Sequence, residues 1–437
     1  MALNLAVVGA GWAGLAAAVR AVQAGHRVTV FESARHVGGR ARSLESSADS
    51  LDNGQHILIG AYSRTLDLMH SVGVDADQVL HRQPLRLVFA DGRHFSLPQG
   101  PQALAFVRGV LACTAWKAAE RWALLRWAAG LGLRAFSCPP GMCVADLCAS
   151  LPAAVRSMLI DPLCVAALNT PASQASAQVF LRVLKDALLG GRGSADLLLP
   201  RTGLDRLLPE PAIGWLKTHG ATVSLGTAAH QLQASESTCH VNGQSFDGVV
   251  LACSASSAAR LTTDLNADWA ASAGALAYEP IITVMLACPG AQLPSAMTAL
   301  VEGADAPAQF VFDHGALGWV PGRFAFVISG AAAWAEKGLA VTAQAVIRQA
   351  LDTFAAGTWP STPTVLKTVA EKRATFRCVP GLRRPGAHVH GRIAAAGDYV
   401  AGPYPATLEG AVRSGEAAVQ ILTLGIPLLD RLPAAAA

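Results

Sequence analysis

Residues 3–32 read Leu3-Asn-Leu-Ala-Val-Val-Gly9-Ala-Gly11-Trp-Ala-Gly14, then an alanine-rich stretch, then Val28-Thr-Val-Phe-Glu32. The apolar run before Gly9 is typical of a buried parallel strand. Gly9 permits a tight turn, Gly11 lets the backbone approach a pyrophosphate, and Gly14 lets the next helix pack closely on the strand. Glu32 ends the second strand with a carboxylate that can accept hydrogen bonds from ribose hydroxyls. This order of strand, glycines, helix, strand and acid predicts an α/β dinucleotide-binding domain of the Rossmann type.

The predicted helix also has a role in binding. It begins at Trp12 and Ala13 and ends near Gly25. The first N–H groups of a helix have no partner within the helix, and its N-terminal end is electropositive. We therefore expect Trp12 and Ala13 to lie beside the phosphates of the dinucleotide.

The segment Gly38-Gly39-Arg40 comes just after the acidic strand. It resembles the Gly-Gly-Arg segment of the amine oxidase and carotenoid desaturase superfamily of flavoproteins. The resemblance implies FAD as the cofactor, with the glycines turning tightly beside its pyrophosphate and Arg40 supplying positive charge. Simple nicotinamide dehydrogenases of the Rossmann type have no need of such a segment.

The C-terminal part of the chain is similar to the same superfamily. Gly397-Asp398-Tyr399 precedes Pro405-Ala-Thr407-Leu408-Glu-Gly-Ala. The resemblance places Asp398 beside the ribityl and pyrophosphate groups and aims the helix from Thr407 and Leu408 at the flavin pyrimidine. A helix N-terminus there would stabilise negative charge on a reduced flavin, and Thr407 is a residue type suited to cap that helix. Tyr399 and Tyr404 are candidates for the wall of the flavin site, with packing as the alternative role.

The domains are expected to be interleaved along the chain. Residues 1–70, 196–255 and 371–437 are predicted to form a discontinuous FAD-binding domain, and residues 71–195 and 256–370 an α+β substrate-binding or cap domain. In the second flavin segment, the resemblance assigns Ala229 to the adenosine end of FAD. The predicted fold class is thus α/β, similar to amine oxidases and phytoene desaturases.

The segment Asp52-Asn-Gly54-Gln55-His56-Ile-Leu-Ile-Gly-Ala-Tyr62 narrows the choice within the superfamily. It is similar to the hydroxysqualene dehydroxylases, also described as squalene-associated FAD-dependent desaturases of hopanoid pathways. The resemblance implies the reductive removal of the hydroxyl from a C30 allylic alcohol, and it places Gly54 beside the flavin ring. Removal of a hydroxyl needs an acid, and His56 is the first candidate. Alternatively, His56 only hydrogen-bonds the flavin or a carbonyl, while Gln55 orients the flavin or substrate.

Two other functions fit the same motifs. A polyprenoid desaturase or oxidase would run hydride transfer in the opposite direction, and the flavin motifs do not distinguish direction. A non-catalytic flavoprotein could pass polyprenoid between enzymes of the squalene pathway. Incubation with hydroxysqualene and with squalene, under reducing and oxidising conditions, separates these hypotheses.

Composition limits the class of binding partner and the expected cellular location. Hydrophobic residues make up 52% of the 437 residues, charged residues 15%, and the net charge is +4, which is too small to indicate nucleic acid as a partner. No apolar run is long enough for a transmembrane helix, and the N-terminal residues do not resemble a signal peptide. We therefore expect a cytoplasmic protein. The nine cysteines, with Cys138, Cys143 and Cys148 at five-residue spacing, match no metal pattern and are expected to be structural thiols.

The stretch Pro101–Phe136 has two interpretations. It contains Trp116, Trp122 and Trp127 among leucine and alanine, with five basic residues and Glu120 as its only acid. A basic amphipathic helix with tryptophan is typical of a membrane-surface element, here on the inner face of the cytoplasmic membrane. The alternative is a cap over the substrate cavity whose charges form a solvated face.

Overall fold

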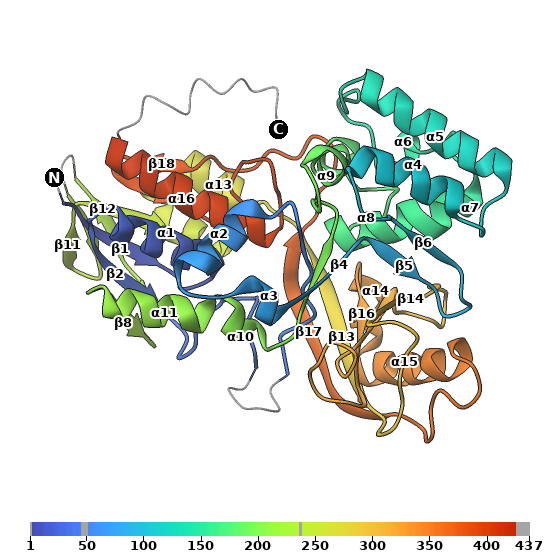
Figure 1. Ribbon diagram of the computed structural model, residues 1–437. Coiled ribbons are helices and arrows are strands. Elements are labelled where there is room, and N and C mark those ends of the chain that lie inside the picture. Colours follow the sequence, from blue (N-terminus) through green and yellow to red (C-terminus); the bar gives the residue numbers. More distant parts are fainter. Residues whose placement is uncertain (1, 45–50, 236–237, 425–437) are drawn as a thin grey trace.

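The computed structural model describes residues 2–44, 51–235 and 238–424. Figure 1 shows two lobes: one is built on a sheet formed by the first strands of the chain, and the other joins a group of helices to a second sheet. Strands and helices of the first lobe come from both ends of the sequence.

The sheet of the first lobe has the order β18-β19-β12-β1-β2-β8. Its strands are His388–His390, Ile393–Ala395, Gly248–Leu251, Asn4–Val8, Arg27–Glu32 and Thr222–Leu225. All neighbours are parallel except β18 and β19. Val7 of β1 lies between Val30 and Val250, and all three are fully buried. The apolar run therefore forms an inner parallel strand, as predicted.

Helices α1 (Trp12–Gln23), α11 (Pro209–Thr218) and α16 (Leu408–Leu424) share one buried core with this sheet. A Cβ at Gly415 of α16 would lie 2.2 Å from the Ala13 carbonyl oxygen in α1. Glycine at this position lets the two helices pack closely, so the motifs at the two ends of the chain meet. The remaining elements of this lobe are β9 (Leu232–Ala234), β10 (Cys239–Val241), β11 (Gln244–Phe246), α12 (Ala255–Thr262) and α13 (Ala267–Gly274).

The second lobe contains an antiparallel sheet of order β14-β15-β16-β13-β17. Its strands are Met297–Ala299, Phe310–Asp313, Arg323–Ile328, Tyr278–Ala287 and Thr364–Phe376. Helix α15 (Leu339–Thr353) packs on one face, and Ile282 and Val284 share its core. The expected domain boundary at residue 371 falls inside β17, which pairs with β13 up to Phe376.

Helices above this sheet complete the lobe (Figure 1). They are α4 (Gln102–Ala112), α5 (Ala118–Leu133), α6 (Val144–Leu147), α7 (Ala153–Val155), the π-helix η1 (Arg156–Ile160), α8 (Asp161–Leu168) and α9 (Ala177–Leu189), with α14 (Ala332–Lys337) beside the sheet. Connections between the lobes include β3 (Leu58–Ile59), α2 (Ser63–Ser71), α3 (Ala76–Val79), β4 (Leu80–Gln83), β5 (Arg86–Val88), β6 (His94–Ser96), β7 (Leu197–Pro200) and α10 (Leu204–Leu207).

The stretch Pro101–Phe136, for which the sequence allows both a membrane-surface helix and a cap over the cavity, does not form a single helix. The stretch forms two helices, and Trp116 lies between them, 2% exposed and 5.4 Å from the Phe95 ring. Trp116 is therefore a core residue that fixes the turn between α4 and α5. Only Trp122 of the three tryptophans is exposed. Within the described ranges, no helix is both long and apolar enough to cross a bilayer.

Candidate flavin and substrate site

A cavity of about 990 Å³ extends between the two lobes. One end is lined by the glycine motifs of both chain ends, and the other by apolar side chains of α4, α5, α8 and α9. The cavity is continuous, so a group held by the glycine motifs would face a molecule held by the helices.

The first glycine motif forms the base of one wall. Gly9 has φ +110°, and a Cβ there would lie 2.6 Å from the Ala252 carbonyl oxygen. Gly11 precedes α1 and carries no side chain that could cap it, so the helix N-terminus opens to the cavity. Trp12 and Ala13 line the cavity as well. Gly14 does not: a Cβ there would lie 1.9 Å from the Gly9 carbonyl oxygen, so its role is close packing of helix on strand.

Glu32 lies where the adenosine ribose is expected. Its carboxylate accepts hydrogen bonds from the backbone N–H groups of Ala10 at 2.7 Å and Ala34 at 2.8 Å. These bonds fix the carboxylate at the end of β2, next to the turn after β1. Ala229 lines the same cavity, in the loop that follows β8.

Arg40 joins the two halves of this wall. Gly38 and Gly39 have φ +97° and +62°, and both line the cavity. The Arg40 guanidinium donates to Asp398 Oδ1 at 2.5 Å and to the Ala374 carbonyl at 2.7 Å. The indole Nε1 of Trp12 donates to the Ala41 carbonyl at 3.0 Å, which holds the arginine segment against α1. Residues some 360 positions apart thus form one charged surface.

The C-terminal segment supplies a second helix N-terminus. Gly397 and Asp398 line the cavity, and a Cβ at Gly397 would strike the Tyr399 ring. Thr407 Oγ1 accepts a hydrogen bond from the Gly410 N–H at 2.9 Å, so Thr407 caps α16, as predicted. Leu408 begins that helix and also faces the cavity.

Sequence reasoning missed one part of this wall. Residues 252–257, which follow β12, line the cavity together with Arg260 and Arg373. Ser254 caps α12, and Arg373 donates to Ser256 Oγ at 2.6 Å. The available signal was the parallel sheet itself: β12 is the neighbour of β1, and the carboxyl ends of parallel strands meet at the ligand edge.

Residues 53–57 of the distinctive segment line the cavity. Asp52 anchors this segment by accepting hydrogen bonds from Ser43 Oγ at 2.7 Å and the Leu204 N–H at 3.1 Å, and burial raises the pKa of this carboxyl to about 7. Gly54, Gln55 and His56 all line the cavity.

His56 and Gln55 have different surroundings. His56 Nδ1 is buried and has no hydrogen-bond partner among the described residues. Burial lowers the pKa of the His56 imidazole to about 4, despite a backbone hydrogen bond at Gly54 that favours the charged form. Gln55 Oε1 lies 3.4 Å from Nε2 of His314, a buried residue stacked on Trp319. His314 was not among the predicted site residues, because nothing local in the sequence links it to Gln55.

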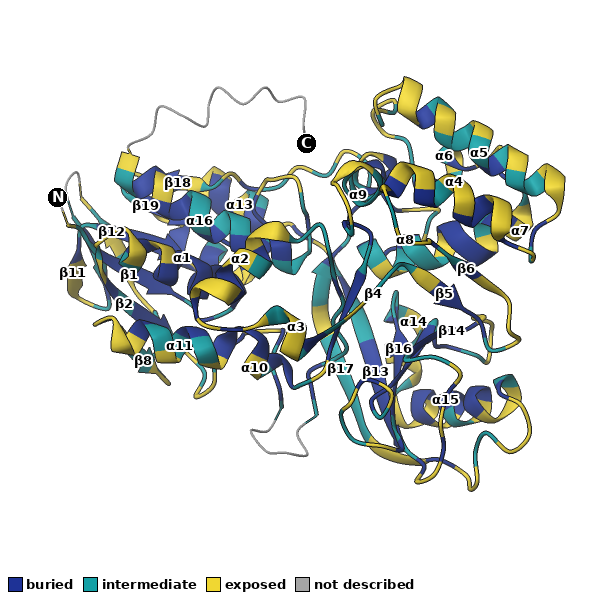
Figure 2. Ribbon diagram, viewed as in Figure 1, coloured by how far each residue is buried: buried dark blue, intermediate teal, exposed yellow. Residues whose placement is uncertain are grey.

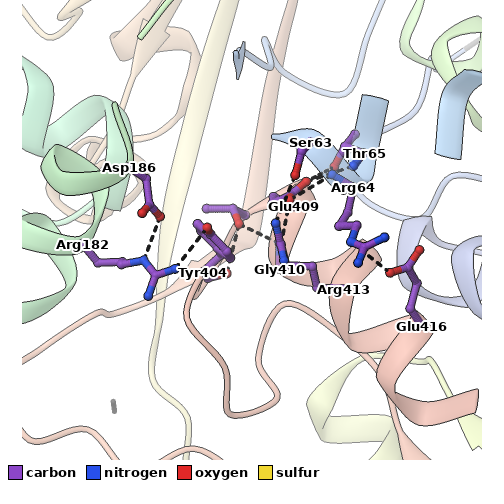
Figure 3. Close-up of polar contacts among 11 residues, drawn as sticks. Ser63, Arg64, Thr65, Arg182, Asp186, Tyr404, Glu409, Gly410, Arg413 and Glu416 are labelled. Atoms are coloured by element: carbon purple, nitrogen blue, oxygen red, sulfur yellow. Dashed lines mark hydrogen bonds and ion pairs between the residues drawn. The ribbon is translucent and has the colours of Figure 1, made fainter. Parts of the chain in front are cut away.

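Tyr404 lines the cavity, and Figure 3 shows its polar contacts with neighbouring residues. Its ring is flanked by the guanidinium groups of Arg182 from α9, at 5.1 Å, and Arg413 from α16, at 4.8 Å. Arg182 also donates to the Tyr404 hydroxyl at 3.2 Å and pairs with Asp186 at 2.7 Å. Tyr404 therefore links helix α9 of the second lobe to the C-terminal segment that contains α16.

The far end of the cavity is apolar. Its lining includes Phe106, Leu124, Trp127, Leu131 and Phe180. The indole Nε1 of Trp127 donates to the Leu147 carbonyl at 3.1 Å, so this tryptophan is a cavity wall and its polar atom is satisfied.

The comparisons with known proteins agree with this geometry. Residues 12–423 match the family of flavin-containing amine oxidoreductases. The chain belongs to this family. An oxidoreductase from Methanosarcina mazei superposes with a TM-score of 0.71 at 15% identity, over 95% of this chain and 100% of that one. Cyclohexylamine oxidase from Brevibacterium oxydans has a TM-score of 0.66 at 18% identity, over 97% and 99%.

Relatives of higher sequence identity carry a more specific name. "Hydroxysqualene dehydroxylase" of Sinorhizobium fredii is 29% identical over 96% of this chain and 98% of its own length. The protein of that name from Rhodopseudomonas palustris is 27% identical over 97% and 99%. "Zeta-carotene desaturase" of Synechocystis matches at 34% identity, but over only 21% of this chain. The full-length similarity is therefore to the dehydroxylases, as predicted.

The residues present fit a flavin. The α1 N-terminus and the side-chain-free wall at Gly11 and Gly39 suit a phosphate group, with Arg40 adding positive charge. The capped N-terminus of α16 suits the electron-rich pyrimidine of the ring. The chain is thus a flavin-dependent oxidoreductase. Its nine cysteines form no disulfide, and no cluster of metal-binding side chains occurs within the described part of the chain.

Proposed function

We propose that this protein uses FAD to remove the hydroxyl group of hydroxysqualene, giving squalene and water. The observation that carries the proposal is the cavity itself. One continuous cavity is lined by glycine backbone and charged groups, by apolar side chains, and by His56 and Gln55. A C30 alcohol has the matching character, because one hydroxyl interrupts a long apolar chain. The names of the full-length relatives support the same substrate.

FAD is the flavin that the whole wall fits. Glu32 and Ala229 lie at the end where an adenosine would bind, beyond the phosphate-binding turn at Gly9 and Gly11. A flavin without the adenosine would leave that end of the site unused. We therefore assign Glu32 to the ribose and Arg40 with Asp398 to the pyrophosphate and ribityl region.

The reaction breaks the C–O bond of the alcohol and forms a C–H bond at the same carbon. Reduced FAD, when bound, supplies the hydrogen and the electron pair, and the hydroxyl leaves as water after gaining a proton. The apolar lining excludes bulk water that would otherwise recapture an allylic cation. Gln55, positioned by His314, orients the groups that meet at the centre of the cavity.

We propose that His56 acts on the leaving hydroxyl. Its unpartnered Nδ1 is free to bond an oxygen placed in the cavity. With a pKa near 4 the ring is neutral at pH 7, so it can hydrogen-bond the hydroxyl but is not an imidazolium that would transfer a proton to it. His56→Ala separates the two roles. General acid catalysis predicts a loss of roughly 10²–10⁴-fold, and positioning predicts less than about tenfold.

The decisive experiment follows the flavin under anaerobic conditions. Protein reduced with dithionite is mixed with hydroxysqualene or with squalene, and flavin absorbance and products are recorded. We expect reoxidation by hydroxysqualene alone, with squalene as the product. No reoxidation by the alcohol, together with reduction of the oxidised enzyme by a polyprenoid hydrocarbon, would instead establish a desaturase.

We also propose that helices α4 and α5 of the second lobe dock on a membrane surface. Figure 2 shows exposed segments on α4 and α5. On these helices Trp122 is 66% exposed and Leu133 91% exposed, and Leu104 and Leu111 are exposed as well. The exposed basic residues of these helices are Arg108, Lys117, Arg126 and Arg134. Apolar and basic side chains together suit an anionic lipid surface. The inner sides of the same helices line the cavity, which would bring the substrate's entry close to the lipid.

Vesicle binding tests this surface. Changing Trp122 and Leu133 to Ser should release the protein from anionic vesicles and leave activity on detergent-solubilised substrate unchanged. Trp127 is not a suitable target, because it lines the cavity. Changing Val341 and Leu351 to Ser, two exposed apolar residues of α15, is the matched control. Equal vesicle binding by the unmodified protein, the Trp122 and Leu133 variant and the control variant would assign α4 and α5 to covering the cavity without membrane contact.

A further inference from the structure

One wall of the cavity contains a hydroxyl group that no predicted role uses. Thr283 lies on β13, where Ile281 and Thr283 face the cavity while Ile282 and Val284 face the core under α15. This alternation follows from the two-residue period of a strand. Thr283 is therefore held on an inner strand of the sheet, between β16 and β17.

The Thr283 hydroxyl is buried without a partner. The residue is 1% exposed, and its Oγ1 is one of seven buried side-chain polar atoms that lack a hydrogen bond within the described residues. Three of the seven belong to residues that line the cavity: His56, Thr283 and Tyr399. Of these three, only Thr283 belongs to the antiparallel sheet of the second lobe. Buried hydroxyls without a partner are uncommon and costly, so a ligand group is the natural partner here.

The space beside this hydroxyl is kept open by a glycine. Gly54 lies opposite, with φ +88°, and a Cβ there would sit 3.6 Å from Thr283 Oγ1 without closer contacts. An atom can therefore be placed next to the hydroxyl from the direction of the segment that carries Gln55 and His56. Both walls belong to the cavity that we assign to the flavin and the alcohol.

We infer that Thr283 binds the hydroxyl group of the substrate and distinguishes the alcohol from the hydrocarbon product. This rests on the proposed function, since it takes a C30 alcohol as the ligand. Thr283 donates its hydroxyl hydrogen to the substrate oxygen, on the side opposite the Gly54–His56 segment. The product has no oxygen, so it loses this hydrogen bond and is released more easily.

Substitutions of two threonines test the inference. Thr298 on β14 of the same sheet also has a buried, unpartnered Oγ1, but it does not line the cavity. Thr283→Val and Thr298→Val therefore remove equivalent hydroxyls, one inside the proposed site and one outside it. Thr283→Ser keeps the hydroxyl and removes only a methyl group.

Binding is measured by titrating the oxidised flavoprotein with hydroxysqualene and with squalene and recording the flavin absorbance change. Thr283→Val should weaken binding of the alcohol roughly tenfold and leave binding of squalene unchanged. Thr283→Ser and Thr298→Val should bind both ligands like the unmodified protein. Thermal unfolding should show both valine variants at least as stable as the unmodified protein, because each loses an unpartnered buried polar group.

The outcomes separate this inference from the proposed function. If the unmodified protein consumes hydroxysqualene and Thr283→Val binds the alcohol equally well, the inference is wrong and the function stands. Equal weakening by Thr298→Val would likewise contradict it, by assigning the effect to the sheet. If the unmodified protein does not consume hydroxysqualene, the proposed function fails, and selective loss of alcohol binding in Thr283→Val would then define an alcohol site without that reaction.

Discussion

The flavin end and the apolar end of the cavity differ in which atoms face inward. At the flavin end, backbone of Gly9, Gly11, Gly38 and Gly39 and two helix N-termini form the wall. At the apolar end, side chains from several short helices form it. A Cβ added to this backbone wall at Gly9 or Gly38 would strike neighbouring atoms, whereas a side-chain wall changes shape with each substitution. The first end is therefore suited to one fixed cofactor, and the second to setting which substrate is accepted.

The largest effect is expected from adding a Cβ to Gly14, which lets α1 pack against β1 behind the glycine wall. Gly14→Ala places a Cβ 1.9 Å from the Gly9 carbonyl oxygen, so α1 must move away from β1. We expect a destabilisation of about 3 kcal/mol or more, with loss of bound flavin. Gly214→Ala is the control: it lies in α11 with no atom within 4 Å of its Cβ position and should be neutral or stabilising. Equal unfolding midpoints for the two variants would refute the close-packing role of Gly14.

A pH titration of stability tests the burial of His314, whose ring lies beside Gln55 of the cavity wall. Burial lowers the pKa of His314 to about 4, from 6.5 for a free histidine. Above pH 6.5 the ring is neutral in the folded and unfolded chains. Between pH 6.5 and 4 only the unfolded chain takes up the proton, so this histidine should lower stability by about 3 kcal/mol as the pH falls. His314→Gln should flatten this part of the stability profile, and His70→Gln, on the exposed side of α2, should not.

Removal of a single carboxylate, which also accepts hydrogen bonds from the Ala10 and Ala34 N–H groups, tests the flavin end. Glu32→Ala should weaken FAD retention roughly 10- to 100-fold, equivalent to about 1.5–3 kcal/mol for charge-assisted bonds to the ribose. The affinity of the refolded or reconstituted protein for FAD is the measurement. Glu336→Ala, at a distance on α14, controls for the loss of an acid. Unchanged retention would mean that the ribose binds elsewhere on the wall.

The apolar end should respond through the substrate and not the cofactor. Ala128 of α5 lines the cavity, and its neighbour Ala129 is exposed. Ala128→Phe should raise the KM for hydroxysqualene roughly tenfold by filling the cavity, with no change in bound flavin. Ala129→Phe adds the same ring outside and should leave KM unchanged. An equal shift in both variants would place α5 differently.

The smallest effect is expected at the contact between Arg182 of α9 and Tyr404 of the C-terminal segment. Arg182→Ala removes the bond from α9 to Tyr404 and the ion pair with Asp186. Because the Arg182 side chain is 40% exposed, we expect a loss below about 1 kcal/mol in unfolding free energy. Faster proteolysis of the cap would still reveal the lost link. Lys185→Ala, on the same helix, is the control, and a larger loss there would argue against the Tyr404 contact.

The flavin end was predictable because its physics is local. Residues 5–14 and 28–32 form neighbouring strands and a helix in the order that their glycines and acid indicated, and Thr407 caps α16 as expected. Cap and turn geometry depends on a few adjacent residues, so a single sequence is enough to recognise it. The family match over residues 12–423 agrees with that reading.

The apolar end was not predictable in the same way. An exposed tryptophan and a buried one look alike in a leucine- and alanine-rich stretch, and Trp116, Trp122 and Trp127 proved to be core, surface and cavity wall. Burial depends on which elements pack against a helix, and composition does not contain that information.

By itself, the sequence determined the dinucleotide fold, the glycine turns, the acid at the end of the second strand and the helix cap, because each depends on short-range backbone sterics and hydrogen bonding. Only the tertiary structure decided that Arg40 pairs with Asp398, that His314 lies beside Gln55 and that Thr283 faces Gly54. These pairs join residues about 230 to 360 positions apart, and their distances are fixed by tertiary packing within the first lobe and between the two lobes. The chemistry proposed here depends on both levels: local motifs hold the cofactor, and long-range packing sets what meets it.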